Sequence, residues 1–342
     1  MITIKEIASK AGVSPGTVDR VLHNRGRVSK ESAERVRLVA REAGYVPNLF
    51  AKRLKEGRSL VFGVLIPDID TDYGYWKQVV DGIEEARREI EALDATIVYS
   101  FFHAGDTNSF IVAAEELFRN PISAYIVAPL VADGMERVVL SHRDVPYAFI
   151  DSSCPSLSPM WDFSQDPIAA GLTGARLMKL FAPSSAVFVL KTGRGAYNEE
   201  MRALSFCRAF GDIAPSIPLK ELSSDGNDML SLFSGMELGE SGSFGVFITN
   251  DQASVVASAL SELSLLDRAC IIGFDLSEDN KACLENGRIG AVIGQRPRTQ
   301  GHDAVMAMYN HFMFQKAPES GNLSAPVDIY IRENIPESTH WL

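Results

Sequence analysis

The chain has few cysteines and no long apolar run, and both shortages narrow what it can be. Four cysteines are scattered among 342 residues, without the paired spacing of a redox or metal-binding motif. We therefore expect reduced, mostly buried thiols, no disulfide framework and no metal site. No segment approaches the roughly 18 apolar residues of a membrane span. Residues 1–20 carry charges and no signal-like apolar core. These features predict a cytoplasmic protein.

The motifs of common enzymes on α/β folds are missing as well. The turn at residues 191–196 lacks the full glycine spacing of a dinucleotide-binding loop. No G-x-S-x-G nucleophile elbow and no Ser/Cys–His–Asp triad order occurs. We therefore predict that the chain is not an enzyme, and we expect no cofactor.

Charge is unevenly distributed along the chain. The whole sequence has a formal net charge of −11, yet residues 1–58 contain 13 Lys and Arg against 6 Asp and Glu, a net of +7. The remaining residues therefore carry a net of −18. A basic head on an acidic body is the charge pattern of one nucleic-acid-binding module joined to a domain with another task.

Residues 3–22 have the pattern of a helix-turn-helix. Apolar residues recur at the spacing of one helical face from Ile4 to Ala8, and Gly12 ends that helix in a tight turn. Ser14 is a favourable N-cap, and the proline after it fits the first helical position. Such a unit usually places its second helix in the major groove of DNA. A helical hairpin that merely packs on its neighbours is the alternative.

A third helix is predicted from its N-cap, Ser29, to Gly44. The segments TIKEIASKAGVS…TV.RVL, VS…R.RV and GY.PN..A..L then follow one another within residues 1–58. In sequence and order, they resemble the DNA-binding headpiece of the lac-repressor (LacI/GalR) family of bacterial transcription regulators. The resemblance extends, less specifically, over nearly the whole chain.

The resemblance implies a set of DNA contacts. The first residues of the second helix, and an arginine one turn later, would reach base edges. Pro15 and Gly16 offer no side-chain hydrogen bond, so Arg20 would carry most of the readout. The segment 48–56 resembles a hinge helix whose paired leucines wedge into the minor groove when a homodimer binds a pseudo-palindromic operator. The predicted DNA-contacting residues are Thr3, Ser14, Pro15, Gly16, Thr17, Arg20, His23, Asn24, Asn48, Ala51 and Leu54.

From Leu60 onward, apolar strand-like runs alternate with helical patterns. Strands are expected at residues 60–66, 96–102, 124–128, 147–150, 186–190, 244–249, 270–274 and 289–294, with a final strand over 327–335. Helices are expected at residues 74–92, 109–119, 168–181, 198–210 and 252–262. Two successive βα series predict two doubly wound parallel-sheet lobes with ligand between them.

The expected fold class is α/β, with an all-α headpiece and a periplasmic-binding-protein-like body. We expect the headpiece at 1–45, a hinge helix and linker at 46–59, and an effector-binding and dimerisation domain at 60–342. Its first lobe would comprise residues of about 60–160 plus 295–322. Its second would comprise about 161–294 plus 323–342.

Polar side chains follow several of these strands, where the family's ligand-contacting residues would lie. The predicted effector-binding residues are Trp76, Asp151, Arg202, Asn250, Asp275 and Gln295, with Tyr73 and Tyr75 beside the tryptophan as further stacking surface. A carboxylate, a guanidinium and two amides could hydrogen-bond vicinal hydroxyls. Helix capping, a surface ion pair and core packing are the alternative roles. Cleft-rim candidates are His103, Asp106, Gln165 and Asp166.

The resemblance favours a repressor whose operator affinity is switched by a small molecule. The carboxylates favour a sugar effector. A nucleoside, a nucleobase or a partner protein remains an alternative. A solute-binding protein without DNA binding is disfavoured by the headpiece. Whether the effector releases or strengthens DNA binding is left open. The last residues of the sequence contain no leucine heptad, so nothing there suggests that a coiled coil joins dimers into a tetramer.

Overall fold

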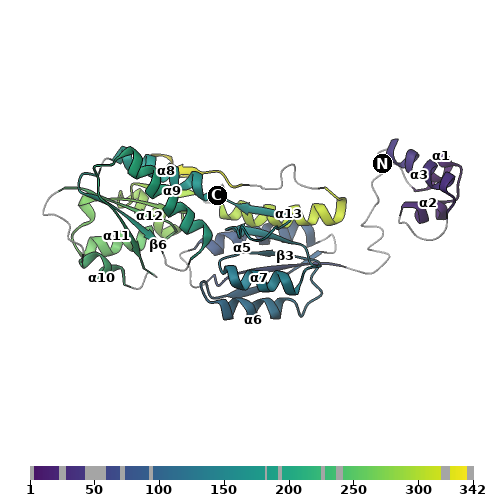
Figure 1. The fold of residues 1–342 in the computed structure, drawn as a ribbon, viewed down its shortest axis with the longest axis horizontal. Coiled ribbons are helices and arrows are strands. Elements are labelled where there is room, and N and C mark those ends of the chain that lie inside the picture. Colours follow the sequence, from purple (N-terminus) through teal and green to yellow (C-terminus); the bar gives the residue numbers. More distant parts are fainter. Residues whose placement is uncertain are drawn as a thin grey trace. The chain divides into compact units, whose positions relative to one another are not determined.

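The computed structural model describes residues 4–22, 28–42, 59–69, 74–91, 95–181, 183–191, 195–224, 228–235, 242–316 and 324–336. Two compact units are present, one of residues 1–58 with 310–316 and a larger one of residues 59–309 with 317–342. We describe each unit by itself (Figure 1).

The described residues of the N-terminal unit contain three helices: α1 (Ile4–Ala11), α2 (Pro15–Leu22) and α3 (Lys30–Glu42). The Ser14 hydroxyl accepts from the Thr17 backbone N–H at 3.1 Å, and the Ser29 hydroxyl accepts from Ser32 in the same way at 3.3 Å. Both predicted N-caps are thus present. Apolar residues of all three helices are buried together: Ile7, Ala8, Ala11, Val18, Val21, Val36 and Ala40. The predicted helix-turn-helix is confirmed.

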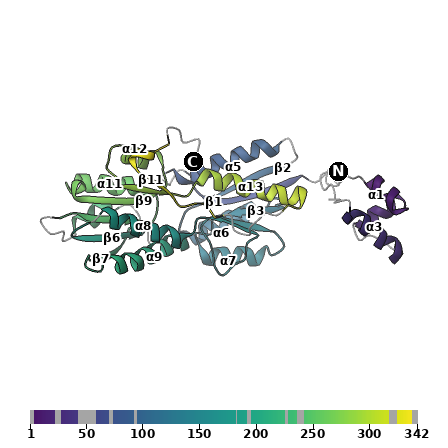
Figure 2. The ribbon, with the colours of Figure 1, turned by 90° about the horizontal axis from the view of Figure 1, so that it is seen from above.

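The first lobe of the larger unit is built on a parallel sheet of order β2-β1-β3-β4-β5. Its strands are β1 (Leu60–Pro67), β2 (Ala95–Phe102), β3 (Ala124–Val127), β4 (Tyr147–Asp151) and β5 (Trp161–Ser164). Its helices are α5 (Tyr75–Ile90), α6 (Thr107–Leu117), α7 (Ala132–Ser141) and α13 (Pro297–Phe314). Helices α5 and α13 cover one face, and α6 and α7 cover the other (Figures 1 and 2).

The second lobe is built on a sheet of order β11-β10-β9-β8-β6-β7, parallel except for β11. Its strands are β6 (Ala186–Lys191), β7 (Leu219–Ser223), β8 (Phe244–Ile248), β9 (Ala269–Phe274), β10 (Ala291–Gly294) and β11 (Asp328–Tyr330). Its helices are α8 (Pro167–Phe181), α9 (Tyr197–Ile213), α10 (Met229–Ser234), α11 (Ala253–Glu262) and α12 (Glu278–Glu285).

Strand β6 illustrates why this sheet needs helices on both faces. Val187 and Val189 pack with α8 and α9, while Phe188 and Leu190 pack with α10 and α11. Side chains alternate between the faces of a strand, so an apolar run must be covered on both. The two doubly wound lobes predicted from the sequence are confirmed.

The chain passes between the lobes after β5, after β10 and before β11. Because β5 pairs with β4, the first sheet extends to Ser164, a few residues beyond the expected limit near 160. Six elements were not predicted: β5, β7, α7, α10, α12 and α13. Each is a short or edge element with a weak apolar pattern, except α13, a long helix whose apolar residues are confined to its second part, from Ala304 onward.

The predicted final strand over 327–335 is wrong beyond Tyr330. Residues Arg332–Asn334 form a short 3-10 turn instead. The Asn334 side chain holds it, because its Oδ1 accepts from the Ile331 N–H at 2.7 Å and its Nδ2 donates to the Ile329 carbonyl at 2.9 Å. A local side-chain contact of this kind competes with strand pairing.

Helices α5 and α13 approach each other backbone to backbone. A Cβ atom at Gly82 would lie 1.9 Å from the Arg298 carbonyl oxygen, and one at Gly301 would lie 2.2 Å from the Val79 carbonyl oxygen. Glycine is therefore required at both positions for α13 to pack on the first lobe. This packing positions the start of α13, next to the end of β10.

We expect Gly82→Ala to destabilise the larger unit by about 1–3 kcal/mol or more, because the helices must separate to admit the methyl group. Chemical denaturation followed by circular dichroism measures the change. Gly211→Ala is the matched control, since a Cβ atom there meets nothing within 4 Å. Alanine is favoured over glycine in a helix by about 1 kcal/mol. Equal stability of the two variants would contradict the packing argument.

Candidate functional site

The exposed side of α2 carries residues that the sequence predicts to contact DNA. Ser14, Pro15, Gly16 and Arg20 are exposed, and Thr17 is half-buried. The Arg20 Nε donates to the Gly16 carbonyl oxygen at 3.0 Å, which holds the side chain along the helix. The remaining predicted contacts lie outside the described residues: Thr3, His23, Asn24, Asn48, Ala51 and Leu54.

In the larger unit, the predicted effector residues lie at the carboxyl ends of the strands. Asp151 is the last residue of β4, while Asn250, Asp275 and Gln295 follow β8, β9 and β10. Arg202 comes from the first half of α9. Ligands of open α/β folds bind at this edge of the sheets. These residues are buried, apart from the half-buried Asn250, and we refer to this polar cluster at the strand ends as the cleft.

Arg202 is a buried guanidinium, with 2% of its surface exposed. Its Nη1 donates to the Thr249 carbonyl oxygen and its Nη2 to Gln295 Oε1, both at 2.9 Å. Gln295 Nε2 in turn donates to Asp275 Oδ2 at 2.9 Å. The Phe274 ring centre lies 4.0 Å from the guanidinium carbon, within cation–π range. One amide therefore links the guanidinium to a buried carboxylate.

Asp151 brings a second buried carboxylate from the first lobe. Its Oδ2 accepts from Asn198 Nδ2 at 3.3 Å, and its backbone N–H donates to Gln300 Oε1 at 3.1 Å. Burial raises the pKa of Tyr75 well above its usual value, and the charges of Asp151 and Asp275 raise it further. The Tyr75 hydroxyl, from the first turn of α5, therefore lies within electrostatic reach of both carboxylates.

Burial outweighs the guanidinium in setting the protonation of these carboxyls. It raises the pKa of Asp151 to about 6, although Arg202 acts to lower it. It raises the pKa of Asp275 to about 7, against the opposing effects of Arg202 and Gln295. The charge of the cleft therefore changes near neutral pH.

Two buried polar atoms in this cluster have no hydrogen-bond partner among the described residues: Arg202 Nε and Asp275 Oδ1. The Tyr75 hydroxyl, in contrast, interacts with the Asp151 carboxylate. Buried polar atoms in native proteins are nearly always paired, and each unmet group costs about 1–3 kcal/mol. A donor and an acceptor side by side suit a ligand that carries hydroxyl groups.

Left-handed backbone occurs at three positions around the cleft. The φ angles are 67° at Asp151, 60° at Asp275 and 54° at Arg296. Aspartate tolerates this region better than most residues, whereas arginine does not. Two hydrogen bonds compensate at Arg296, whose Nε and Nη2 donate to the Asp328 carboxylate at 2.6 and 3.1 Å. Strained backbone held by its surroundings is common at ligand sites.

Asn280 holds the loop that carries Asp275. It is fully buried, and its Nδ2 donates to the carbonyl oxygens of Asp251, Phe274 and Asp275 at 2.9–3.0 Å. Its Oδ1 accepts from the Ser254 N–H at 2.8 Å. One side chain thus joins the ends of β8 and β9 to α11 and positions the carboxylate.

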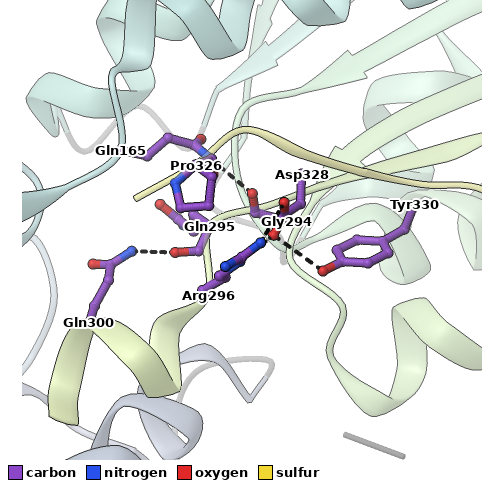
Figure 3. Close-up of polar contacts among 8 residues, drawn as sticks. All are labelled: Gln165, Gly294, Gln295, Arg296, Gln300, Pro326, Asp328 and Tyr330. Carbon is purple, nitrogen blue, oxygen red and sulfur yellow. Dashed lines mark hydrogen bonds and ion pairs between the residues drawn. The ribbon is translucent and has the colours of Figure 1, made fainter. Parts of the chain in front are cut away.

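Two glutamines tie the crossover segments together, as Figure 3 shows. Gln165 Nε2 donates to the carbonyl oxygens of Gly294 and Pro326 at 2.9 and 2.8 Å. Gln300 Nε2 donates to the Gln295 carbonyl at 2.7 Å. Its Oε1 accepts from the Asp151 N–H, as described above. The backbone of Gln295 is therefore linked to the end of β4 in the first lobe.

The cleft-rim candidates have other roles in the structure. Asp106 is the N-cap of α6, and its Oδ1 accepts from the N–H groups of Asn108 and Ser109. Asp166 caps the start of α8 in the same way. His103 Nδ1 lies 2.5 Å from Asp68 Oδ2 at an exposed position. Gln165 is a crossover residue rather than a rim residue.

Two predicted effector residues are engaged within the protein. Trp76 is 6% exposed and packs edge-on against Tyr75, with ring centres 5.0 Å apart, so it does not present an open stacking face. Asn250 Oδ1 accepts from the Gln252 N–H at 3.1 Å, and its Nδ2 lies 3.5 Å from Glu199 Oε2. For Asn250, the alternative of a turn-forming residue describes the local geometry. Tyr73 lies outside the described residues.

Several residues of the cleft were missed from the sequence. Asn198, Asn280 and Gln300 each contact remote backbone or a remote carboxylate, and such partners leave no local pattern. Tyr75 was considered only for its ring, whereas its hydroxyl is the part that meets the carboxylates. The helix at 197–213 could have directed attention to Asn198, one turn before Arg202 on the same face.

Within the described ranges, no group of three or more His, Cys, Asp or Glu side chains could hold a metal ion. All four cysteines are unpaired thiols. No helix in the described part of the chain is long and apolar enough to cross a membrane.

The fold and cleft define a class: a two-lobed, periplasmic-binding-protein-like body joined to an N-terminal helix-turn-helix. The family model for bacterial regulatory proteins of the lacI family matches residues 3–48, and a periplasmic binding protein domain model matches residues 62–316. Residues 3–48 therefore carry the helix-turn-helix of the lacI family, and the larger unit belongs to the periplasmic binding protein domain family. The resemblance read from the sequence is confirmed.

MalR of Streptococcus pneumoniae, an HTH-type transcriptional regulator, is 40% identical over 226 residues, which cover 59% of this chain and 63% of MalR. The chain thus spans less than two thirds of that relative. A lac repressor dimer bound to operator and the anti-inducer ONPF has a TM-score of 0.64 at 21% identity, covering 96% of this chain and 97% of the repressor. A solute-binding protein from Agrobacterium vitis, bound with α-D-tagatopyranose, has a TM-score of 0.70 at 16% identity, covering 82% and 97%. Both structures share the fold.

We expect Asp275→Asn to change how stability depends on pH. Asp275 has a pKa of about 7 in the folded chain, against a usual value of 3.8. Its contribution to the free energy of unfolding therefore falls as pH rises from about 4 to about 7 and is constant above. Asparagine tolerates the left-handed backbone and can accept from Gln295, but it does not titrate. The variant should therefore gain stability relative to wild type across this window.

Urea unfolding at half-unit pH steps measures the difference. Asp166→Asn, at an exposed helix cap, controls for the loss of a carboxylate outside the cleft. Parallel stability curves for wild type and Asp275→Asn would show that Asp275 is not a buried, proton-binding group.

Proposed function

We propose that this chain is a sequence-specific DNA-binding transcription regulator that acts as a repressor. A sugar bound between its lobes would switch its affinity for the operator. The observation that carries the proposal is the pair of buried polar atoms without a partner among the described residues, Arg202 Nε and Asp275 Oδ1. This polar cluster lies at the strand ends of the larger unit, and the same chain also carries a helix-turn-helix. A regulator that responds to an effector needs both an effector site and a DNA-binding unit.

On the DNA side, the exposed second helix and the charge of residues 1–58 support the proposal. Arg20 is exposed on α2, six residues after the Ser14 N-cap, where an arginine of a recognition helix could contact a guanine O6/N7 pair. The net charge of +7 over these residues suits phosphate contacts, whereas the acidic remainder does not. A homodimer on a pseudo-palindromic operator is the proposed assembly.

On the effector side, the switch is a change in how the two lobes meet. Asp151 belongs to the first lobe, while Arg202, Asp275 and Gln295 belong to the second or to a crossover. A ligand bonded to both sets favours one arrangement of the lobes by its differential affinity. In a dimer, that arrangement would set the separation of the two hinge segments over residues 46–59. Release of operator on sugar binding is the direction we propose.

We expect Arg20→Ala to weaken binding to the specific operator by about 1–3 kcal/mol, through loss of a bidentate base contact. Fluorescence anisotropy with labelled operator, selected from random DNA by the wild-type chain, measures this. Arg208→Ala, at an exposed position of α9 in the larger unit, is the matched control. Unchanged operator affinity in Arg20→Ala would remove α2 as the recognition helix.

For the effector, we expect a sugar to raise the thermal midpoint of the full chain. A ligand at about 100 times its Kd adds about 2.7 kcal/mol, which is several degrees for a unit of this size. Asp275→Ala should lose this shift and the release of operator, while operator binding without effector survives. A panel of monosaccharides and nucleosides decides between effector classes.

A midpoint shift with nucleosides alone would replace the sugar by a nucleoside as the effector. An Asp275→Ala variant that responds to the sugar as wild type does would remove Asp275 from the site. A chain that binds no operator but does bind sugar would be a solute-binding protein, and the regulatory proposal would fall.

A further inference from the structure

The charges around the cleft restrict its ligand more than its hydrogen-bonding groups do. Asp151 and Asp275 are 6% and 3% exposed, from opposite lobes. Burial is the main cause of the raised pKa of Asp275, and the charge of Asp151 adds to it. Burial is also the main cause of the raised pKa of Asp151. The charge of Arg202 lowers this pKa, and the charge of Glu199 raises it. Three carboxyl groups therefore act on one small region.

Arg202 is the cation that opposes these carboxyls, and its charge is already balanced within the protein. Its Nη1 and Nη2 donate to the Thr249 carbonyl and to Gln295, as described above. Gln295 in turn donates to Asp275, and the charge of Arg202 acts on both Asp151 and Asp275. One guanidinium therefore faces two buried carboxyl groups, and an anionic ligand would have to compete with them for it.

The N-terminus of α5 is a second source of positive potential near the cleft. Gly74 precedes it and has no side-chain cap. Tyr75 occupies its first turn, however, and the carboxylates of Asp151 and Asp275 both act on that residue. An anion at this helix end would therefore lie in the negative field of both carboxylates. The partial charge of a helix end, about half a unit, does not offset them.

We propose that the cleft excludes anionic effectors and takes a polyhydroxylated compound that carries no phosphate or carboxylate group. The inference rests on the proposed function and narrows its effector class. It separates free sugars from the sugar phosphates and sugar acids that a cell also contains. A hydroxyl can donate to Asp275 Oδ1 and accept from Arg202 Nε, and an ammonium group can replace a hydroxyl as the donor.

The test compares matched sets of compounds on the full-length chain by thermal unfolding and calorimetry at pH 7.5. Each set contains a sugar, its phosphate ester, its uronic acid and its amino derivative, for example glucose, glucose 6-phosphate, glucuronate and glucosamine. Galactose, mannose and ribose series extend it. For the set that binds, we expect the phosphate ester and the acid to bind on the order of a hundredfold more weakly than the parent sugar.

Asp275→Asn should reduce the difference in affinity between the parent sugar and its anionic derivatives, because it removes one negative charge and keeps an acceptor for Gln295. Asp106→Asn, at the exposed cap of α6, is the matched control and should leave this difference unchanged. A phosphate ester or acid that binds as tightly as its parent sugar would overturn the inference and leave effector switching in place. A shift of the thermal midpoint with uncharged nucleosides alone would contradict the proposal that the effector is a sugar. It would agree with the proposal that the cleft excludes anions.

A second measurement tests the charge of the cleft without any ligand. Wild type, Asp151→Asn, Asp275→Asn and the double variant form a cycle, in which unfolding is measured at pH 5.0 and pH 8.0. If the two carboxylates repel each other, Asp151→Asn should raise the unfolding midpoint at pH 8.0. The increase should be larger in the wild-type chain than in the Asp275→Asn variant. At pH 5.0, with the carboxyls protonated, this difference should vanish. A cycle without coupling at pH 8.0 would overturn the inference, whatever the panel shows.

Discussion

The buried guanidinium of Arg202 is the interaction on which the arrangement of the cleft depends. A charged group with 2% exposure is stable only when its hydrogen bonds are made and a counter-charge is near. Arg202 meets these needs with the Thr249 carbonyl after β8, the Gln295 amide after β10 and the carboxylates beyond them. The ends of three strands and the start of α9 are thereby held in one geometry.

The same cluster explains why the cleft resembles a ligand site rather than an ordinary core. An ordinary core would pair every polar atom, yet Arg202 and Asp275 each retain one atom without a hydrogen-bond partner among the described residues. Two carboxyl groups also share a single strong counter-charge, so that burial dominates their pKa values. Both features cost stability. A bound group that donates to Asp275 Oδ1 and accepts from Arg202 Nε would offset the first of these costs.

Much of the fold follows from local patterns that can be recognised without the structure. The helix-turn-helix requires only an apolar face, a glycine turn and the Ser14 cap, and these lie within twenty residues. The buried strands such as β6 are apolar on both faces, which is typical of parallel sheets. The strand-end polar residues Asp275 and Gln295 were found for the same reason, since buried strands have no need of them. Elements at sheet edges, such as β5 and β7, have mixed patterns and were missed.

The sequence by itself determined the order of the domains, the headpiece, the two parallel lobes and the strand ends at which polar residues gather, because each depends on neighbours within one or two turns or strands. Only the tertiary structure decided which of these residues face one another. Asn198, Asn280 and Gln300 owe their roles to backbone and carboxylate groups that are between 5 and 149 positions away in the chain. Packing also decides that Trp76 is buried in the core and that Asp106 caps α6. The groups that cover or bond a side chain are brought to it by the fold, and the local sequence pattern does not encode them.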